Sequence, residues 1–381
     1  MRSKIMPTQI MLLSAIAALV VFFVPAPPHA AADAPAGVDR RPYEQAVQKG
    51  IDYLRVKGQS ADGSFSATAG PGITAIVAMS VMRNGRSPDD PLVAKSLKYL
   101  EKFVQPDGGI YDPKSRISNY ETCLGMICFA EANRDGRYTT LLKNAEKFLK
   151  GLQSEESINR QPSDVSYGGA GYGGPGRPDL SNTHFLMDAL QAAGDGPDDE
   201  AVKRALLFVS RCQNLETAHN TTAFAAKNPD GGFYYTPSGG GSSPAGKTPD
   251  GGLRSYGSMT YAGLKSMIFA GLKPDDPRVK AAVEWARKNY TLDQNPGLGS
   301  AGLYYYYHLF GKALDALGQK TLTDSNGKVH DWRAELVAEL AERQQTDGSW
   351  VNKDSRWLEG DPNLVTGYAL LTLSYCRPQK P

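Results

Sequence analysis

Four consecutive tyrosines, Tyr304 to Tyr307, stand directly before His308. Because successive side chains of a helix point in different directions, only one or two of the four can face a central cavity. Aromatic walls suit an apolar polyene, a carbocation or a sugar ring. The run therefore predicts either a wall of a ligand site or a packed core in which the hydroxyl groups find partners.

Other ionisable and aromatic residues stand near the starts of apolar segments. Glu121 and His184 open two such segments, and Tyr120 and Tyr256 lie close to segment starts. Carboxylates, imidazoles and phenols of this kind can form the mouth of a barrel that acts on a glycan. No spacing in the sequence singles these residues out, so core packing remains the alternative.

Two helix types alternate along the chain and must position these residues. The first type is amphipathic and starts at aspartates followed by proline, as at Asp90 and Asp276, a strong helix-start signal. The second type is almost uniformly apolar, as a helix buried on most sides must be. Six segments are of the second type, namely residues 73–79, 122–130, 183–193, 260–270, 303–317 and 366–375.

Six polar-faced helices that alternate with six buried ones predict a repeat architecture with a shared core. Five of the buried segments carry Thr in the first turn, and the fifth segment has the tyrosine run instead. Strand signals are nearly absent. We therefore predict an all-α fold, an (α/α)6 toroid with six inner and six outer helices.

A recurring turn supports the repeat. Residues 344–350 read QQTDGSW, with weaker copies at 59–65, 105–111 and 228–234. Gly348 permits a backbone conformation that other residues resist, and Asp347 can accept a hydrogen bond within its own turn. A turn repeated this often is structural, so we expect Gln345, Trp350 and their counterparts Phe65 and Phe233 to do no chemistry.

The first 32 residues have the features of a signal peptide. Arg2 and Lys4 precede an apolar run of 15 residues, Ile10 to Val24, and alanines 30–32 form a small-residue cleavage site. We expect an exported protein, periplasmic or extracellular, with a retained membrane anchor as the alternative. The expected organisation is a signal peptide at 1–32, a linker at 33–40, the toroid at 41–376 and a tail at 377–381.

Charge and cysteine content limit the partners. The chain has 42 basic and 40 acidic residues, and cleavage would remove Arg2 and Lys4 and leave a neutral protein. Neither nucleic acid nor a membrane span in the mature chain is expected. The cysteines at 123, 128, 212 and 376 could pair in an exported protein; buried free thiols are the favoured interpretation.

Two Gly-rich stretches, Ser166 to Pro178 and Gly239 to Gly252, interrupt the helical rhythm. Neither carries the Gly-Lys-Ser/Thr ending of a phosphate-binding loop. They are expected at one end of the ring, either as lids over a central cavity or as plain surface loops.

These patterns resemble the squalene cyclase and prenyltransferase-repeat superfamily of α/α toroids. Residues 345–350 are similar to that family's Gln-to-Trp repeat, and residues 302–317 to an inner helix of its exported members. The resemblance covers about residues 41–376 and implies the fold. Because cyclases, prenyltransferase subunits and non-enzymatic domains share this fold, it leaves open whether this protein is an enzyme.

The resemblance also gives two hypotheses about chemistry. Cyclases that protonate an alkene use an Asp-x-Asp-Asp signature, which is absent from this sequence. Prenyltransferase β-subunits hold zinc through an Asp-x-Cys at the start of one inner helix and a later His. Glu121, Cys123 and His184 are the similar positions here, so the resemblance implies a possible zinc site, with a buried Cys, Glu and His as the alternative.

Three functions remain open at this stage. The first is an exported toroid that binds or acts on an apolar, isoprenoid-like small molecule in its central cavity. The second is a non-catalytic scaffold for an unknown protein partner, and the third is a glycan-acting enzyme. The candidate catalytic residues are Glu121, His184, Tyr305 and His308, and the candidate ligand-binding residues are Tyr120, Tyr256, Tyr304 and Tyr306.

Overall fold

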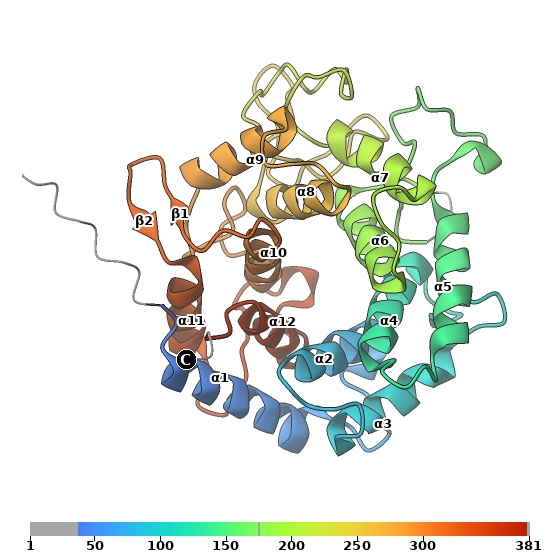
Figure 1. The fold of residues 1–381 in the computed structure, drawn as a ribbon, viewed down its shortest axis with the longest axis vertical. Coiled ribbons are helices and arrows are strands. Elements are labelled where there is room, and N and C mark those ends of the chain that lie inside the picture. Colours follow the sequence, from blue (N-terminus) through green and yellow to red (C-terminus); the bar gives the residue numbers. More distant parts are fainter. Residues whose placement is uncertain (1–36, 174–175, 379–381) are drawn as a thin grey trace, which may run out of the picture. The chain divides into compact units, whose positions relative to one another are not determined.

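The computed structural model describes residues 37–173 and 176–378, where twelve α-helices alternate between an outer and an inner ring (Figure 1). The outer helices are α1 (Arg40–Tyr53), α3 (Pro91–Leu100), α5 (Thr139–Leu152), α7 (Glu200–Arg211), α9 (Pro277–Lys288) and α11 (Trp332–Arg343). The inner helices are α2 (Gly72–Arg83), α4 (Ser118–Ala132), α6 (Leu180–Ala193), α8 (Gly257–Phe269), α10 (Leu303–Ala316) and α12 (Pro362–Ser374). The predicted signal peptide, part of the predicted linker and the last three residues lie outside the described residues.

The inner helices form a closed ring. Each packs against the next one along the chain, and α12 packs against α2 to close the circle, as Figure 1 shows. The inner helices are buried over most of their length; every residue of α2 from Gly72 to Met82 is buried. The predicted (α/α)6 toroid is therefore confirmed.

Short elements complete the described part of the chain. Its two strands, β1 (Leu322–Thr323) and β2 (Val329–His330), pair as a small antiparallel hairpin outside the inner ring. One π-helical turn extends α1 at Leu54–Gly58. Short 3₁₀ turns lie at Ala67–Ala69, Glu101–Phe103, Glu156–Ile158 and Arg356–Leu358.

The recurring threonines tie the inner helices to the turns that precede them. The Thr74 hydroxyl accepts the backbone N–H of Phe65 at 2.9 Å, and Thr366 accepts that of Trp350 at 3.1 Å. The same bond recurs at Thr122, Thr183 and Thr260. The Thr pattern in the sequence thus reflects one buried hydrogen bond in five of the six repeats, which satisfies an otherwise unpaired backbone group.

The glutamine that acts in the last turn is Gln344, not Gln345. Gln344 donates to the carbonyl oxygens of Gly348 at 2.9 Å and of Ala46, in α1, at 3.0 Å. The bond to Ala46 links α11 to α1, whereas the side-chain amide of Gln345 donates to the Arg343 carbonyl at 3.3 Å, within its own segment. The Gln-to-Trp resemblance was placed on residues 345–350, one residue after the glutamine that makes these bonds.

Glycine is required at the same turn. Gly348 has a φ of 92°, and a Cβ at this position would lie 2.4 Å from the Lys49 carbonyl oxygen. A side chain would therefore both strain the turn and push α1 away.

All four cysteines are buried and free. Among the described residues, no helix has the length and the apolar content that a membrane crossing requires.

Candidate functional site

A cavity of about 480 Å³ lies where the N-terminal ends of the inner helices meet the loops that precede them. We call it the aromatic chamber because six tyrosines, one phenylalanine and one tryptophan line it: Tyr120, Tyr172, Phe185, Tyr235, Tyr256, Tyr305, Trp357 and Tyr368. Aliphatic side chains from α2 and α12, including Ile73, Ile76 and Leu364, fill the spaces between the rings. Ligand sites have this composition, an apolar wall with a few polar groups.

Tyr305 is the member of the tyrosine run that lines the chamber. Its ring is stacked on Phe185, with centroids 6.1 Å apart, and its hydroxyl lies 3.0 Å from the Ser181 hydroxyl. Tyr304 and Tyr306 do not line the chamber. Tyr306 packs against Tyr261 and donates to the Thr291 carbonyl at 2.7 Å.

The helical rotation explains this division. Tyr304 and Tyr306 stand on either side of Tyr305, so their side chains turn away from the direction that Tyr305 takes. Tyr304 meets Tyr307 edge-on, with ring centroids 5.7 Å apart. The predicted ligand-binding role of Tyr304 and Tyr306 is therefore not supported by their positions, whereas Tyr120 and Tyr256 do line the chamber.

Glu121 is one of the candidate residues named from the sequence, and it lines the chamber from the first turn of α4. The residue is 2% exposed, and its Oε2 accepts the Asp112 backbone N–H at 3.1 Å. Burial raises the pKa of Glu121 to about 7, because a buried carboxylate loses hydration. At neutral pH this carboxyl group can both accept and donate a hydrogen bond.

Glu359 is the second carboxyl group in the chamber wall, but its oxygens are already used. They accept the backbone N–H groups of Tyr305 at 2.8 Å and Tyr304 at 3.2 Å, and the Asn352 amide at 2.7 Å. Glu359 therefore caps α10, the inner helix whose first turn lacks a threonine. Glu121, the other carboxyl group of the lining, does not cap α10 and is therefore the candidate to meet a ligand.

The remaining predicted residues lie deeper in the ring and outside the chamber lining. His184 is fully buried, with Nδ1 3.2 Å from the Ser266 hydroxyl and Nε2 3.2 Å from an Asp188 oxygen. Burial lowers the pKa of His184 to about 3, so its ring is neutral. His308 is also buried and stacks on Tyr368, with centroids 5.9 Å apart. Neither imidazole is placed to meet a ligand in the chamber.

The structure does not bring the hypothesised zinc ligands together. Cys123 is buried, with its sulfur 3.8 Å from the Asn119 amide oxygen, while Glu121 faces the chamber and His184 contacts Ser266. Over the described ranges, no three His, Cys, Asp or Glu side chains are grouped so as to hold a metal ion. A shared position at helix starts does not make these side chains converge.

Loops supply several of the chamber residues that sequence reasoning missed, while Phe185 of α6 and Tyr368 of α12 are missed residues on inner helices. Tyr172 comes from the first Gly-rich stretch, and Ser242 and Pro244 from the second. Trp357 and Leu358 form an exposed rim, and both have positive φ values, 55° and 65°. Such conformations cost roughly 1–3 kcal/mol each and tend to occur at functional sites.

A pH-dependent difference in stability is expected for Glu121→Gln. The raised pKa means that Glu121 favours the folded state most below pH 4.5, and that this contribution is lost as pH rises through about 7. At pH 8 the variant should be more stable than wild type by about 1–2 kcal/mol, a value reduced for solvent screening. At pH 4.5 the two should unfold alike. Urea unfolding at both pH values measures this, and equal curves at pH 8 would contradict it.

Comparison with known proteins gives a fold but no family. No protein-family model matches the chain, and no curated protein matches it. Among solved structures, the type II terpene cyclase MstE from Scytonema has 13% sequence identity and a TM-score of 0.50, over 87% of this chain and 97% of that one. A family 88 glycosyl hydrolase from Bacteroides vulgatus has 9% identity and a TM-score of 0.52, over 87% and 97%.

A glycosidase variant in complex with glucose is similar to the same degree, with 13% identity and a TM-score of 0.52 over 89% of this chain and 99% of that one. At such identities the likeness defines the fold alone. The chain has the α/α-toroid architecture shared by terpene cyclases and glycan-acting enzymes. The fold does not distinguish these functions, so the choice rests on the residues of the aromatic chamber.

Proposed function

We propose that this protein is an exported toroid that binds an apolar, isoprenoid-like small molecule in its aromatic chamber. The observation that carries the proposal is the chamber wall, in which eight aromatic side chains surround about 480 Å³. Burial of apolar surface against such a wall is the main source of affinity for a ligand of this kind. The terpene cyclase with this fold has also been solved with a geranylgeranyl-bearing substrate, which supports the choice of ligand.

Glu121 indicates what the chamber does with the polar end of such a ligand. A carboxyl group with a pKa of about 7 can donate a hydrogen bond to an alcohol or carbonyl oxygen at neutral pH. An acid this weak does not suit protonation of an alkene, which needs a strongly acidic group. The raised pKa therefore agrees with the missing Asp-x-Asp-Asp signature, and we propose binding rather than cyclisation started by a proton.

The glycan alternative fits the chamber less well. Glycoside hydrolysis generally needs two carboxyl groups, one on each side of the scissile bond. The lining has two, but Glu359 holds the first turn of α10 through the N–H groups of Tyr304 and Tyr305. Glu121 would have to act without a free partner in the lining.

Binding can be tested with a variant that fills the chamber. Farnesol and geranylgeraniol should bind the purified protein saturably in calorimetric titrations, and a neutral oligosaccharide should not. Ser242→Trp places an indole at the chamber wall and should weaken terpenol binding by about tenfold or more, because the ring occupies ligand space.

Ser243→Trp is the matched control, since Ser243 is the next residue and lies outside the lining. It should bind terpenols as wild type does. Oligosaccharide binding without terpenol binding would favour the glycan-acting enzyme. Binding of neither class would favour the scaffold for a protein partner.

A further inference from the structure

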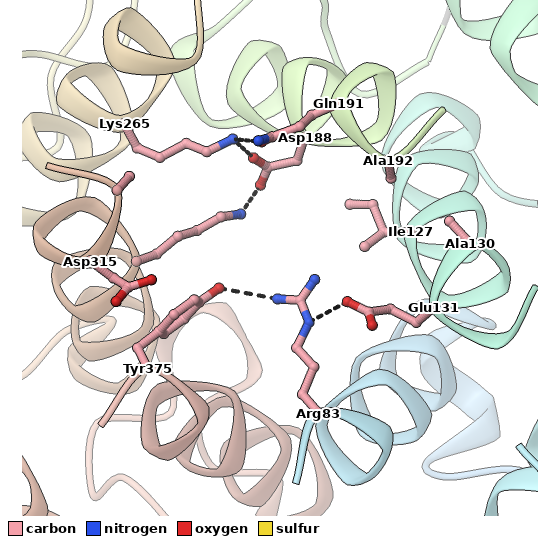
Figure 2. A pocket seen from close by; sticks show the side chains of 12 residues that line it. Arg83, Ile127, Ala130, Glu131, Asp188, Gln191, Ala192, Lys265, Asp315 and Tyr375 are labelled. Carbon is pink, nitrogen blue, oxygen red and sulfur yellow. Dashed lines mark hydrogen bonds and ion pairs between the residues drawn. The ribbon is translucent and has the colours of Figure 1, made fainter. Parts of the chain in front are cut away.

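A second cavity, of about 530 Å³, lies at the opposite ends of the inner helices (Figure 2). We call it the charged chamber; no residue lines both chambers. Its walls come from the C-terminal parts of α2, α4, α6, α8 and α10 and from Tyr375, just after α12. Figure 2 shows the Arg83 side chain projecting into it from the side opposite Lys265 and Asp188. The function proposed for the aromatic chamber uses none of these groups.

Two lysines share one carboxylate in this chamber. Lys265 and Lys312 both form ion pairs with Asp188, whose side chain is 4% exposed. The neighbouring His184 is neutral, so it adds no charge. Two ammonium groups on one carboxylate leave an excess of one positive charge.

The other charged groups of the lining do not remove this excess. Arg83 pairs with Glu131 through Nε at 2.6 Å. Asp315 is paired with Arg333, which lies outside the lining, at 2.7 Å. The lining itself holds three basic and three acidic side chains. Because Asp315 is neutralised by Arg333 from outside the lining, the ion-paired groups that remain around the cavity carry one excess positive charge.

Hydrogen-bond donors are also in excess. The Arg83 Nη1 donates to the Tyr375 hydroxyl at 3.1 Å, which leaves the hydroxyl hydrogen free to donate in turn. Arg83 Nη2 has no hydrogen-bond partner among the described residues (Figure 2). Gln191 uses its oxygen to accept from Lys265 at 2.7 Å, so its amide hydrogens remain available. The group that complements such a set accepts hydrogen bonds and carries negative charge.

The helix ends explain only part of this arrangement. The C-termini of helices favour nearby cations, which helps lysines remain charged in a buried place. They do not explain why the free donors of Arg83, Tyr375 and Gln191 border one cavity. We propose that the charged chamber binds the carboxylate group of a small organic acid, held by Lys312, Arg83 and Tyr375.

Acetate is the probe for this site, with inorganic phosphate as the comparison and chloride used to keep the ionic strength constant. Ligand-observed NMR should show saturable binding of acetate to the full protein. Lys312→Met should weaken that binding roughly ten- to hundredfold, the effect of losing a charge-assisted hydrogen bond. The variant keeps the pair between Lys265 and Asp188, so it should fold.

Lys203→Met is the matched control, because Lys203 is an exposed lysine of α7 paired only with Glu200. It should bind acetate as wild type does. Arg83→Lys, which removes the free Nη2, gives an independent second variant and should also weaken binding. Non-saturable binding, binding of phosphate alone, or unchanged affinity in both chamber variants would overturn the proposal. Terpenol binding to the aromatic chamber is measured separately, so either proposal can fail alone.

Discussion

An Asp188→Asn variant is expected to lose about 3–5 kcal/mol of unfolding free energy. Burial alone would raise the pKa of Asp188, but the ammonium groups of Lys265 and Lys312 hold it well below its usual range. Asparagine keeps the shape of the side chain and removes its charge. The buried ammonium group of Lys265 and the partly buried one of Lys312 are then left without a counter-charge, the costly case for a buried ion pair. Urea unfolding at neutral pH measures the difference.

The control for this prediction removes all three charges together. With leucine at positions 188, 265 and 312, no buried charge remains unpaired, and the protein should unfold within about 1.5 kcal/mol of wild type or be more stable. A loss below about 1 kcal/mol in Asp188→Asn would show that water already screens the cluster. That result would also weaken the charge argument for the carboxylate site.

The ring was predictable because its signals are local and repeated. Helical spacing, Asp-Pro starts and the first-turn threonines are signals of this kind. Each locates a helix from a short stretch of sequence. The predicted inner segment 303–317 corresponds to α10 at Leu303–Ala316. The sequence did not show which glutamine of the turn at residues 344–350 bonds to α1. Gln344 and Gln345 are adjacent, and only their different hydrogen bonds distinguish them.

The chamber was only partly predictable, because its wall depends on loops. Glu121, Tyr120 and Tyr305 stand at inner-helix starts, where a ring must place them near one end. Tyr172 and Trp357 reach the same cavity from irregular segments whose paths no periodicity describes. The tyrosine run could indicate that α10 contributes to a cavity wall. The rotation of α10, which its packing sets, determines which tyrosine of the run lines the chamber.

The charged chamber had no sequence signal at all. Asp188 lies 77 residues from Lys265 and 124 residues from Lys312, and each of the three lies in a largely apolar segment with few other charges. In the sequence, such residues look like ordinary helix-end charges. The two lysines meet the Asp188 carboxylate only because the inner helices are arranged in a ring.

Trp350→Ala is expected to cost about 3–5 kcal/mol of unfolding free energy, the range for loss of a large buried aromatic residue. Trp350 is fully buried, and its Nε1 donates to the Leu340 carbonyl of α11 at 2.7 Å. Its backbone N–H bonds to Thr366 of α12, and its ring lies so close to Gly50 of α1 that a Cβ there would be 2.8 Å from it. One side chain thus joins three helices where the ring closes.

Trp357→Ala is the matched control, because Trp357 is 45% exposed and its removal should change stability by about 1 kcal/mol or less. Denaturant unfolding of both variants makes the comparison, and terpenol titration adds a second one. If the turn at residues 344–350 is purely structural, the Trp350→Ala variant should retain its terpenol affinity under conditions where the protein is still folded. The Trp357→Ala variant should lose part of its terpenol affinity. A folded Trp350→Ala variant with normal stability but no terpenol binding would mean that the turn around Trp350, and not the aromatic chamber, holds the ligand.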